Sequence, residues 1–103
     1  MTVAKFVTII LYPRSSESTF DLQYYLSKHI PFAKEVWAPC GMKVQSISEM
    51  DDAYHLVTVL EWEGRDGYEK ALQDPRTEDV MTNAKDGSFT TSKLIFLTGD
   101  IVG

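Results

Sequence analysis

The chain has 103 residues, 44% of them hydrophobic and 12% aromatic, so we expect one ordered globular domain. Its formal net charge of −5 and its scattered lysines and arginines provide no basic surface for nucleic acid or for an interfacial membrane helix. No apolar run approaches the roughly 20 residues of a membrane span. One cysteine excludes an internal disulfide, and no signal peptide is visible, so we expect a soluble, cytoplasmic protein.

The first predicted element is a strand over residues 3–12, which is rich in β-branched and aromatic residues and stops at Pro13. Both faces of this strand are largely apolar: they carry Val3, Lys5, Val7, Ile9 and Leu11 on one side and Ala4, Phe6, Thr8, Ile10 and Tyr12 on the other. A sheet with one face in water normally alternates more cleanly, so we expect both faces to be covered. Residues 14–19 are polar and predict a loop.

A helix is predicted to begin at Asp21, whose carboxylate can cap the first turn, and to end before Gly41. Its apolar side chains recur at three- and four-residue spacing: Leu22, Tyr25, Leu26, His29, Phe32, Ala33, Val36 and Trp37. Pro31 removes a backbone donor and clashes with the carbonyl of Ser27, so we expect a kink or a break there. His29 would then lie beside a carbonyl that is freed from the helix.

Residues 42–50 alternate weakly and predict a solvated second strand, whereas residues 54–63 predict a strong third strand. A short acidic turn at Asp51 and Asp52 joins them, which indicates an antiparallel hairpin. One face of the third strand carries Tyr54, Leu56, Thr58, Leu60 and Trp62. His55 lies on the opposite face.

A second helix is predicted from Gly64, with Asp66 and Glu69 as a variant of the capping box. Asp74 followed by Pro75 then predicts a restart of the helix, with Asp74 as its N-cap. The apolar contacts of this part come from Val80, Met81 and Ala84, and the segment closes at Asp86 and Gly87. Residues 90–102 predict the last strand.

The resulting order, β-α-β-β-α-β, predicts an α+β protein with an antiparallel four-stranded sheet and both helices on one face. The first, third and fourth strands are apolar on both sides, so the other face would expose a larger apolar patch than monomers normally show. The simplest cover is a second copy of the same sheet. We therefore expect a twofold homodimer that packs sheet on sheet.

The run FDLQYYLSKHIPFAKEVW, with Gly41 after it, closely resembles the signature of the EthD family. The segments YHLVTVLEW and ALQDPRTEDVM also match that family, so the resemblance covers nearly the whole chain, and the His-Ile-Pro segment is its most specific part. The resemblance implies a ferredoxin-like fold of the dimeric α/β barrel superfamily, with residues 1–103 as one EthD-like domain. Relatives by fold include muconolactone isomerases, cofactor-free monooxygenases, polyketide cyclases and haem-binding proteins, so the resemblance implies fold more firmly than reaction.

In that superfamily each subunit has a pocket between its sheet and its helices. The resemblance implies an aromatic pocket here, with the substrate-binding candidates Trp37, Phe32, Tyr54 and Trp62. His29 matches the motif histidine and is the best acid–base candidate, because imidazole exchanges protons near neutral pH. Tyr25 and Tyr12 would assist as hydrogen-bonding groups. Alternatively, His29 binds the carbonyl freed by Pro31 and only holds the kink, while a haem-ligand role is conceivable by analogy of fold.

Other reactive side chains carry weaker signals. His55 would face the dimer partner if Tyr54 and Trp62 face the helices. Cys40 follows a helix C-terminus, where the negative end of the dipole disfavours a thiolate, so we expect a packing residue. The two histidines have no metal-ligand spacing, and the sequence has no phosphate-binding loop or CxxC motif, so neither a metal nor a cofactor is expected.

These features predict a small cofactor-independent enzyme that acts on an aromatic or polyketide-like metabolite by acid/base proton transfer. The reaction would be of the isomerase, cyclase, dehydratase or decarboxylase type, so the enzyme would be an isomerase or a lyase. One alternative is an oxidoreductase, a cofactor-free monooxygenase that oxidises a phenolic substrate to a quinone. A third, of another class, is a non-catalytic small-molecule-binding or accessory protein of a degradation or biosynthesis pathway.

Overall fold

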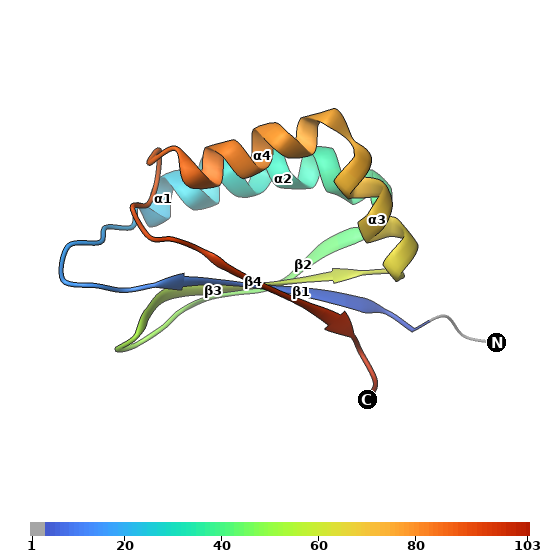
Figure 1. Ribbon diagram of the computed structural model, residues 1–103, viewed down its shortest axis with the longest axis horizontal. Helices are drawn as coiled ribbons and strands as arrows, with labels where there is room; N and C mark the ends of the chain where they lie inside the picture. Colours follow the sequence, from blue (N-terminus) through green and yellow to red (C-terminus); the bar gives the residue numbers. More distant parts are fainter. Residues whose placement is uncertain (1–3) are drawn as a thin grey trace.

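A computed structural model describes residues 4–103 and shows one antiparallel sheet with helices on one face (Figure 1). The strands are β1 (Phe6–Pro13), β2 (Met42–Glu49), β3 (Tyr54–Trp62) and β4 (Ile95–Asp100), in the spatial order β2-β3-β1-β4. This is the split arrangement predicted from the element order, with β1 and β3 in the centre. The predicted start of the first strand at Val3 lies outside the described residues. No helix in the described range is long and apolar enough to cross a membrane.

The first helical run is continuous and consists of α1 (Leu22–Tyr24), a π-helical turn η1 (Tyr25–His29), α2 (Ile30–Trp37) and a 3-10 turn η2 (Ala38–Cys40). It is capped as predicted, since Asp21 Oδ1 accepts from the Tyr24 amide at 3.0 Å and Gly41 ends it with φ 87°. The perturbation predicted at Pro31 takes the form of a wider turn and not a break. The Ile30 amide reaches back to the Tyr25 carbonyl, five residues away, and this widening makes room for the proline ring.

The second helical part consists of α3 (Arg65–Gln73) and α4 (Pro75–Lys85). Asp74 caps α4 as predicted, because its Oδ1 accepts from the Arg76 amide at 2.9 Å. The capping box predicted at Asp66 and Glu69 is wrong. Gly64 is the N-cap of α3 and no side chain caps it; Asp66 lies inside the first turn, where its charge still complements the helix dipole.

The last strand is shorter than predicted: β4 begins at Ile95 and not at residue 90. The preceding residues connect the end of α4 to the sheet edge, and their polar groups bond locally. Thr90 Oγ1 donates to the Thr19 carbonyl at 2.7 Å and accepts from the Ser92 amide at 3.1 Å. Such side-chain bonds compete with a strand ladder, so only a single bridge between Thr90 and Phe20 forms here.

The register of the sheet decides which residues face the helices. Ile9 of β1 lies opposite Val59 of β3 and Leu97 of β4. The alternation buries the following side chains beneath the helices: Phe6, Thr8, Ile10, Tyr12, Leu56, Thr58, Leu60 and Trp62. No described element covers the other face (Figure 1). We call that side the open apolar face; it carries Val7, Ile9, Leu11, Val57, Val59, Ile95 and Leu97.

A close approach of backbones fixes α3 against η2, and Gly67 permits it. A Cβ atom at Gly67 would overlap the carbonyl oxygen of Cys40, whereas a Cβ atom at Gly99 of β4 would meet only open space. We therefore expect Gly67→Ala to lower the free energy of unfolding by about 1–3 kcal/mol, as overpacking does. Without the overlap, this substitution within a helix would instead stabilise by up to about 1 kcal/mol, so the sign of the change is diagnostic.

Urea unfolding followed by circular dichroism measures the effect. Gly103→Ala, whose Cβ atom would also meet only open space, is the control and should change stability by less than about 0.5 kcal/mol. A Gly67→Ala variant as stable as the original chain would contradict the packing described for α3 and η2.

Candidate functional site

His29 is a buried residue of η1, with 5% of its surface exposed, and α4 fixes its ring. The imidazole Nδ1 lies 2.8 Å from Asn83 Oδ1, and Asn83 Nδ2 donates to the hydroxyl of Tyr24 at 3.1 Å. Because the amide nitrogen is directed to Tyr24, the amide oxygen faces His29 and accepts its Nδ1 proton. The neutral ring therefore carries its lone pair on Nε2.

The other ring nitrogen of His29, Nε2, is not held by a hydrogen bond to the described part of the chain. Nε2 makes no hydrogen bond within residues 4–103, yet every fully enclosed side-chain nitrogen or oxygen in that range has a partner. Nε2 therefore retains contact with accessible space. The alternative in which His29 binds a carbonyl freed by Pro31 is wrong, because the partner of the ring is a side chain of α4.

The surroundings of His29 keep it neutral. Tyr25 stacks on the imidazole with 5.4 Å between ring centroids, and the Phe89 ring lies at 4.7 Å. Burial lowers the pKa of His29 below its ordinary value of 6.5, because an imidazolium loses hydration there, and the hydrogen bond to Asn83 and the charge of Asp86 offset this only in part. At neutral pH the ring is therefore uncharged and able to accept a proton.

The two candidate tyrosines lie beside His29 and bond to each other. The hydroxyl of Tyr25 lies 2.7 Å from Thr58 Oγ1, and the hydroxyl of Tyr12 donates to that of Tyr25 at a long 3.4 Å. Burial is the largest cause that raises the pKa of both phenols, so they remain protonated and can donate hydrogen bonds but do not act as bases.

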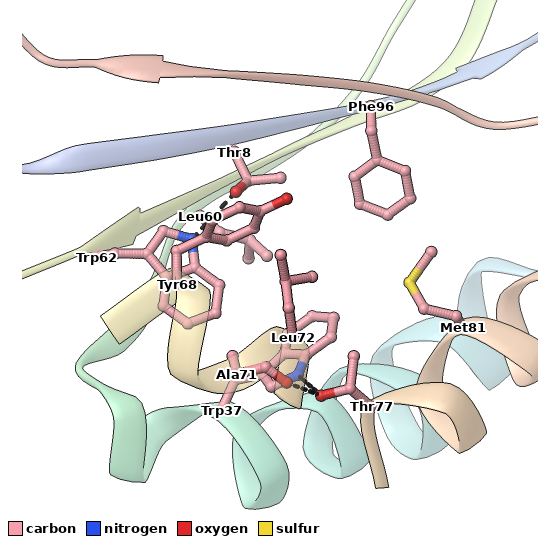
Figure 2. A pocket seen from close by; sticks show the side chains of 10 residues that line it. All are labelled: Thr8, Trp37, Leu60, Trp62, Tyr68, Ala71, Leu72, Thr77, Met81 and Phe96. Carbon is pink, nitrogen blue, oxygen red and sulfur yellow. Dashed lines mark hydrogen bonds between the residues drawn. The ribbon is translucent and has the colours of Figure 1, made fainter. Parts of the chain in front are cut away.

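Two adjoining cavities lie between the sheet and the helices. The inner cavity is lined by His29, Tyr25, Tyr12 and Thr58 and has a volume of only about 10 Å³, roughly the room that one water molecule needs. The outer chamber has a volume of about 280 Å³, near the lower end of the range of about 300–1,000 Å³ for small-molecule sites. It is lined by Thr8, Trp37, Leu60, Trp62, Tyr68, Ala71, Leu72, Thr77, Met81 and Phe96 (Figure 2).

The inner cavity and the outer chamber share four lining residues, Trp37, Leu60, Met81 and Phe96, so they are neighbours. Of these two cavities, only the outer chamber has room for a ligand of more than a few atoms in this conformation. The imidazole lies at the inner cavity, so a ligand must displace a shared side chain to touch it. Met81 suits this role because methionine is unbranched and flexible.

The structure brings together some of the predicted site residues and separates others. His29, Tyr25 and Tyr12 line the inner cavity, Trp62 lines the outer chamber and Trp37 lines both. Phe32 and Tyr54 line neither. Phe32 is half-buried against the core, and Tyr54 lies at the start of β3, opposite Pro13.

Asn83 and Tyr68 are site residues that the sequence patterns did not reveal. Asn83 meets His29 across 54 positions in the chain, and Tyr68 reaches the outer chamber from α3. Both placements depend on how α3 and α4 pack, which no local periodicity encodes. The only available signal was that Asn83 is the single asparagine of the chain.

The remaining reactive side chains lie elsewhere. His55 Nε2 is 2.8 Å from Ser18 Oγ, and the ring lies 5.9 Å from that of Phe20. The segment between β1 and α1 of the same chain therefore holds the His55 ring. Cys40 is half-buried and packs against the core. Within residues 4–103 no three His, Cys, Asp or Glu side chains gather closely enough to hold a metal ion.

Comparison with known proteins gives structural matches alone. No family model matches the sequence, and no curated protein matches it at a significant level. An EthD-like protein from Ralstonia eutropha JMP134 has a similar structure, with 13% sequence identity and a TM-score of 0.77 over 98% of this chain and 95% of that chain. A monooxygenase from the gene ActVA-Orf6 of Streptomyces coelicolor, solved with the ligand nanaomycin D, has 15% identity and a TM-score of 0.68 over 97% and 89%.

A dimeric ferredoxin-like protein from an uncultured marine organism is also similar, with 18% identity and a TM-score of 0.63 over 97% of this chain and 96% of that chain. At such identities the likeness shows the fold. The predicted α+β, ferredoxin-like fold is therefore confirmed. The EthD-like protein has the same fold, as the resemblance of the His-Ile-Pro helix predicted.

The bond between Asn83 and His29 predicts the tautomer of the imidazole. Nitrogen chemical shifts measured by NMR at pH 7 should show a neutral ring protonated on Nδ1. In Asn83→Leu this tautomer should lose its dominance, and in Asn83→Asp the pKa of His29 should rise, because a carboxylate favours the imidazolium.

The exposed neighbour on α4 provides the control: Thr82→Ala should leave the shifts of His29 unchanged. A ring protonated on Nε2 in the original chain, or one unaffected by both Asn83 variants, would show that Asn83 does not set the tautomer.

Proposed function

We propose that this chain is a small, cofactor-independent enzyme that moves a proton on an aromatic or polyketide-like metabolite bound between the sheet and the helices. One observation carries the proposal: a buried, neutral imidazole, held by Asn83 and free at Nε2, borders a cavity system with aromatic walls. An imidazole in such a setting is suited to general acid–base catalysis near neutral pH. The similar fold of an EthD-like protein is consistent with this proposal but does not specify the reaction.

The proposed step is a transfer at a carbon next to a carbonyl group. Nε2 of His29 takes the proton, the electrons of the C–H bond form an enolate, and the imidazolium returns the proton to another atom of the same molecule. Asn83 Oδ1 accepts from Nδ1–H throughout and stabilises the positive charge on the ring. Tyr25, protonated at neutral pH, would donate to the enolate oxygen, and Tyr12 would assist by donating to the Tyr25 hydroxyl.

A second candidate function is the oxidation of a phenol to a quinone by molecular oxygen. The structural likeness to the Streptomyces coelicolor monooxygenase favours it. In this reaction His29 would take the phenolic proton, one oxygen atom of O₂ would enter the quinone and the other would leave as water. Oxygen consumption separates this reaction from proton transfer, which consumes none.

His29→Gln tests the proposed role of the imidazole. With β-tetralone in D₂O as a probe, the protein should speed deuterium exchange at the acidic carbon, and the variant should lose about 10²-fold or more of that rate. Proton NMR follows the exchange, and an oxygen electrode with a naphthol tests the second function.

His55→Gln is the matched control, because His55 lies outside both cavities and should retain the full rate. A folded His29→Gln variant with an undiminished rate would exclude His29 as the base. Saturable binding of the probe with no exchange and no oxygen uptake would instead favour the non-catalytic binding protein.

We also propose that a second copy of the chain covers the open apolar face. Seven aliphatic side chains of β1, β3 and β4 form this face, a larger apolar surface than monomers normally leave in water. At one rim Glu61 bonds to Lys5 at 3.4 Å and to Lys43 at 3.0 Å, which gives the face the polar border that interfaces have. The marine protein of similar fold is dimeric.

Ile9→Lys tests this dimer, because it places an unpaired charge in the centre of the open apolar face. At micromolar concentration, light scattering should give twice the mass of the chain for the original protein and the mass of one chain for the variant. Leu26→Lys is the control: Leu26 is exposed on the helical layer, so this change should leave the mass doubled. A single-chain mass for the original protein would refute the dimer.

A further inference from the structure

We infer that the outer chamber selects an uncharged ligand with a hydrogen-bond-accepting oxygen, and that the hydroxyl of Tyr68 is the donor that positions it. This inference rests on the proposed function in taking the outer chamber as the substrate site, and it adds the chemical class of the substrate and its orientation.

The lining of the outer chamber excludes a charged ligand. None of its ten lining side chains is acidic or basic. An ionised carboxylate, phosphate or ammonium group would lose its hydration there and meet no opposite charge, and such burial is strongly unfavourable. The ligand that fits is therefore neutral over the part that enters the chamber.

The polar groups of the outer chamber are mostly engaged with one another (Figure 2). Trp62 Nε1 donates to Thr8 Oγ1 at 3.0 Å, and Trp37 Nε1 donates to Thr77 Oγ1 at 2.8 Å. The proton of the Thr77 hydroxyl goes in turn to the Ala71 carbonyl. Neither tryptophan nor Thr77 therefore has a donor left for a ligand.

Tyr68 is different, because its hydroxyl makes no hydrogen bond within residues 4–103, whereas that of Thr8 already accepts from Trp62, and it points into the space in front of Phe96 (Figure 2). Its ring is held by aromatic neighbours, with centroids 4.9 Å from that of Phe6 and 5.4 Å from that of Trp62. A fixed ring with a free hydroxyl is a preorganised donor. A ketone, quinone or phenol oxygen is the group that it would bind.

The position of Tyr68 also orients the ligand. Tyr68 borders the outer chamber alone, whereas Met81 and Phe96 border both the outer chamber and the inner cavity. A ligand whose oxygen lies at Tyr68 therefore presents its opposite end to Met81, Phe96 and, beyond them, the inner cavity with His29. The inferred substrate is a flat, uncharged molecule, bound through one oxygen and reactive at its far end.

The two tryptophans of the chain both line the outer chamber, so intrinsic fluorescence reports occupancy directly. We would titrate the protein with α-tetralone, with tetralin, which has the same rings without the oxygen, and with naphthoate, which is charged. The ketone should bind about 2- to 10-fold more tightly than tetralin, the worth of one neutral hydrogen bond, and naphthoate should bind more weakly than both.

Tyr68→Phe should reduce the affinity for α-tetralone to that for tetralin and leave tetralin binding unchanged. Thermal unfolding should be unaltered, because the lost hydroxyl has no partner among the described residues. Tyr54→Phe, outside both cavities, should change neither affinity.

An unchanged preference for the ketone in Tyr68→Phe, equal binding of naphthoate, or no saturable quenching by any of the three compounds would each overturn the inference. The readout is independent of catalysis. If His29→Gln binds α-tetralone normally and the original protein exchanges no deuterium, the proposed reaction fails while the ligand class stands.

Discussion

The alternation of side chains in the two central strands constrains the whole molecule. Beneath the helices, β1 and β3 present large apolar groups, but each strand also places one threonine near its middle, Thr8 in β1 and Thr58 in β3. Thr8 lines the outer chamber and Thr58 the inner cavity, so both spaces lie over small side chains. Their hydroxyls satisfy Trp62 and Tyr25, which otherwise would bury unpaired polar groups. The same two residues thus open the space and hold the aromatic walls around it.

The helical layer contributes His29 through one irregular turn. Pro31 cannot continue an ordinary helix, and the π-helical turn before it stacks Tyr25 on His29. Turns of this kind often occur at functional sites. The packing of α4 then brings Asn83 to the imidazole and fixes the tautomer that leaves Nε2 free. A buried base with one satisfied nitrogen and one free nitrogen is the result, and it lies next to a ligand-sized chamber without charge.

Local sequence patterns predicted much of this arrangement, but they failed where contacts between elements far apart in the sequence determine the structure. The caps at Asp21 and Asp74 and the stop at Gly41 follow from side-chain chemistry, and the strands with two apolar faces follow from periodicity. The grouping of His29 with the two tyrosines was expected from the family resemblance. The capping box at Asp66 failed because α3 begins at Arg65 with Gly64 as its N-cap, so Asp66 already lies inside the first turn. The early start of the last strand failed because Thr90 and Ser92 bond locally. Tyr68 and Asn83 could not be found, since their partners come from other elements.

The proposed chemistry therefore depends on one claim, that a small neutral molecule binds in the space between Trp62, Tyr68 and Phe96. A crystal structure of the protein with α-tetralone tests it most directly. We expect density for the ligand inside the outer chamber, with the ketone oxygen within hydrogen-bond distance of the Tyr68 hydroxyl and the far end of the ring system directed at Met81. A fully occupied ligand on the open apolar face, with the outer chamber closed by its own side chains, would contradict it.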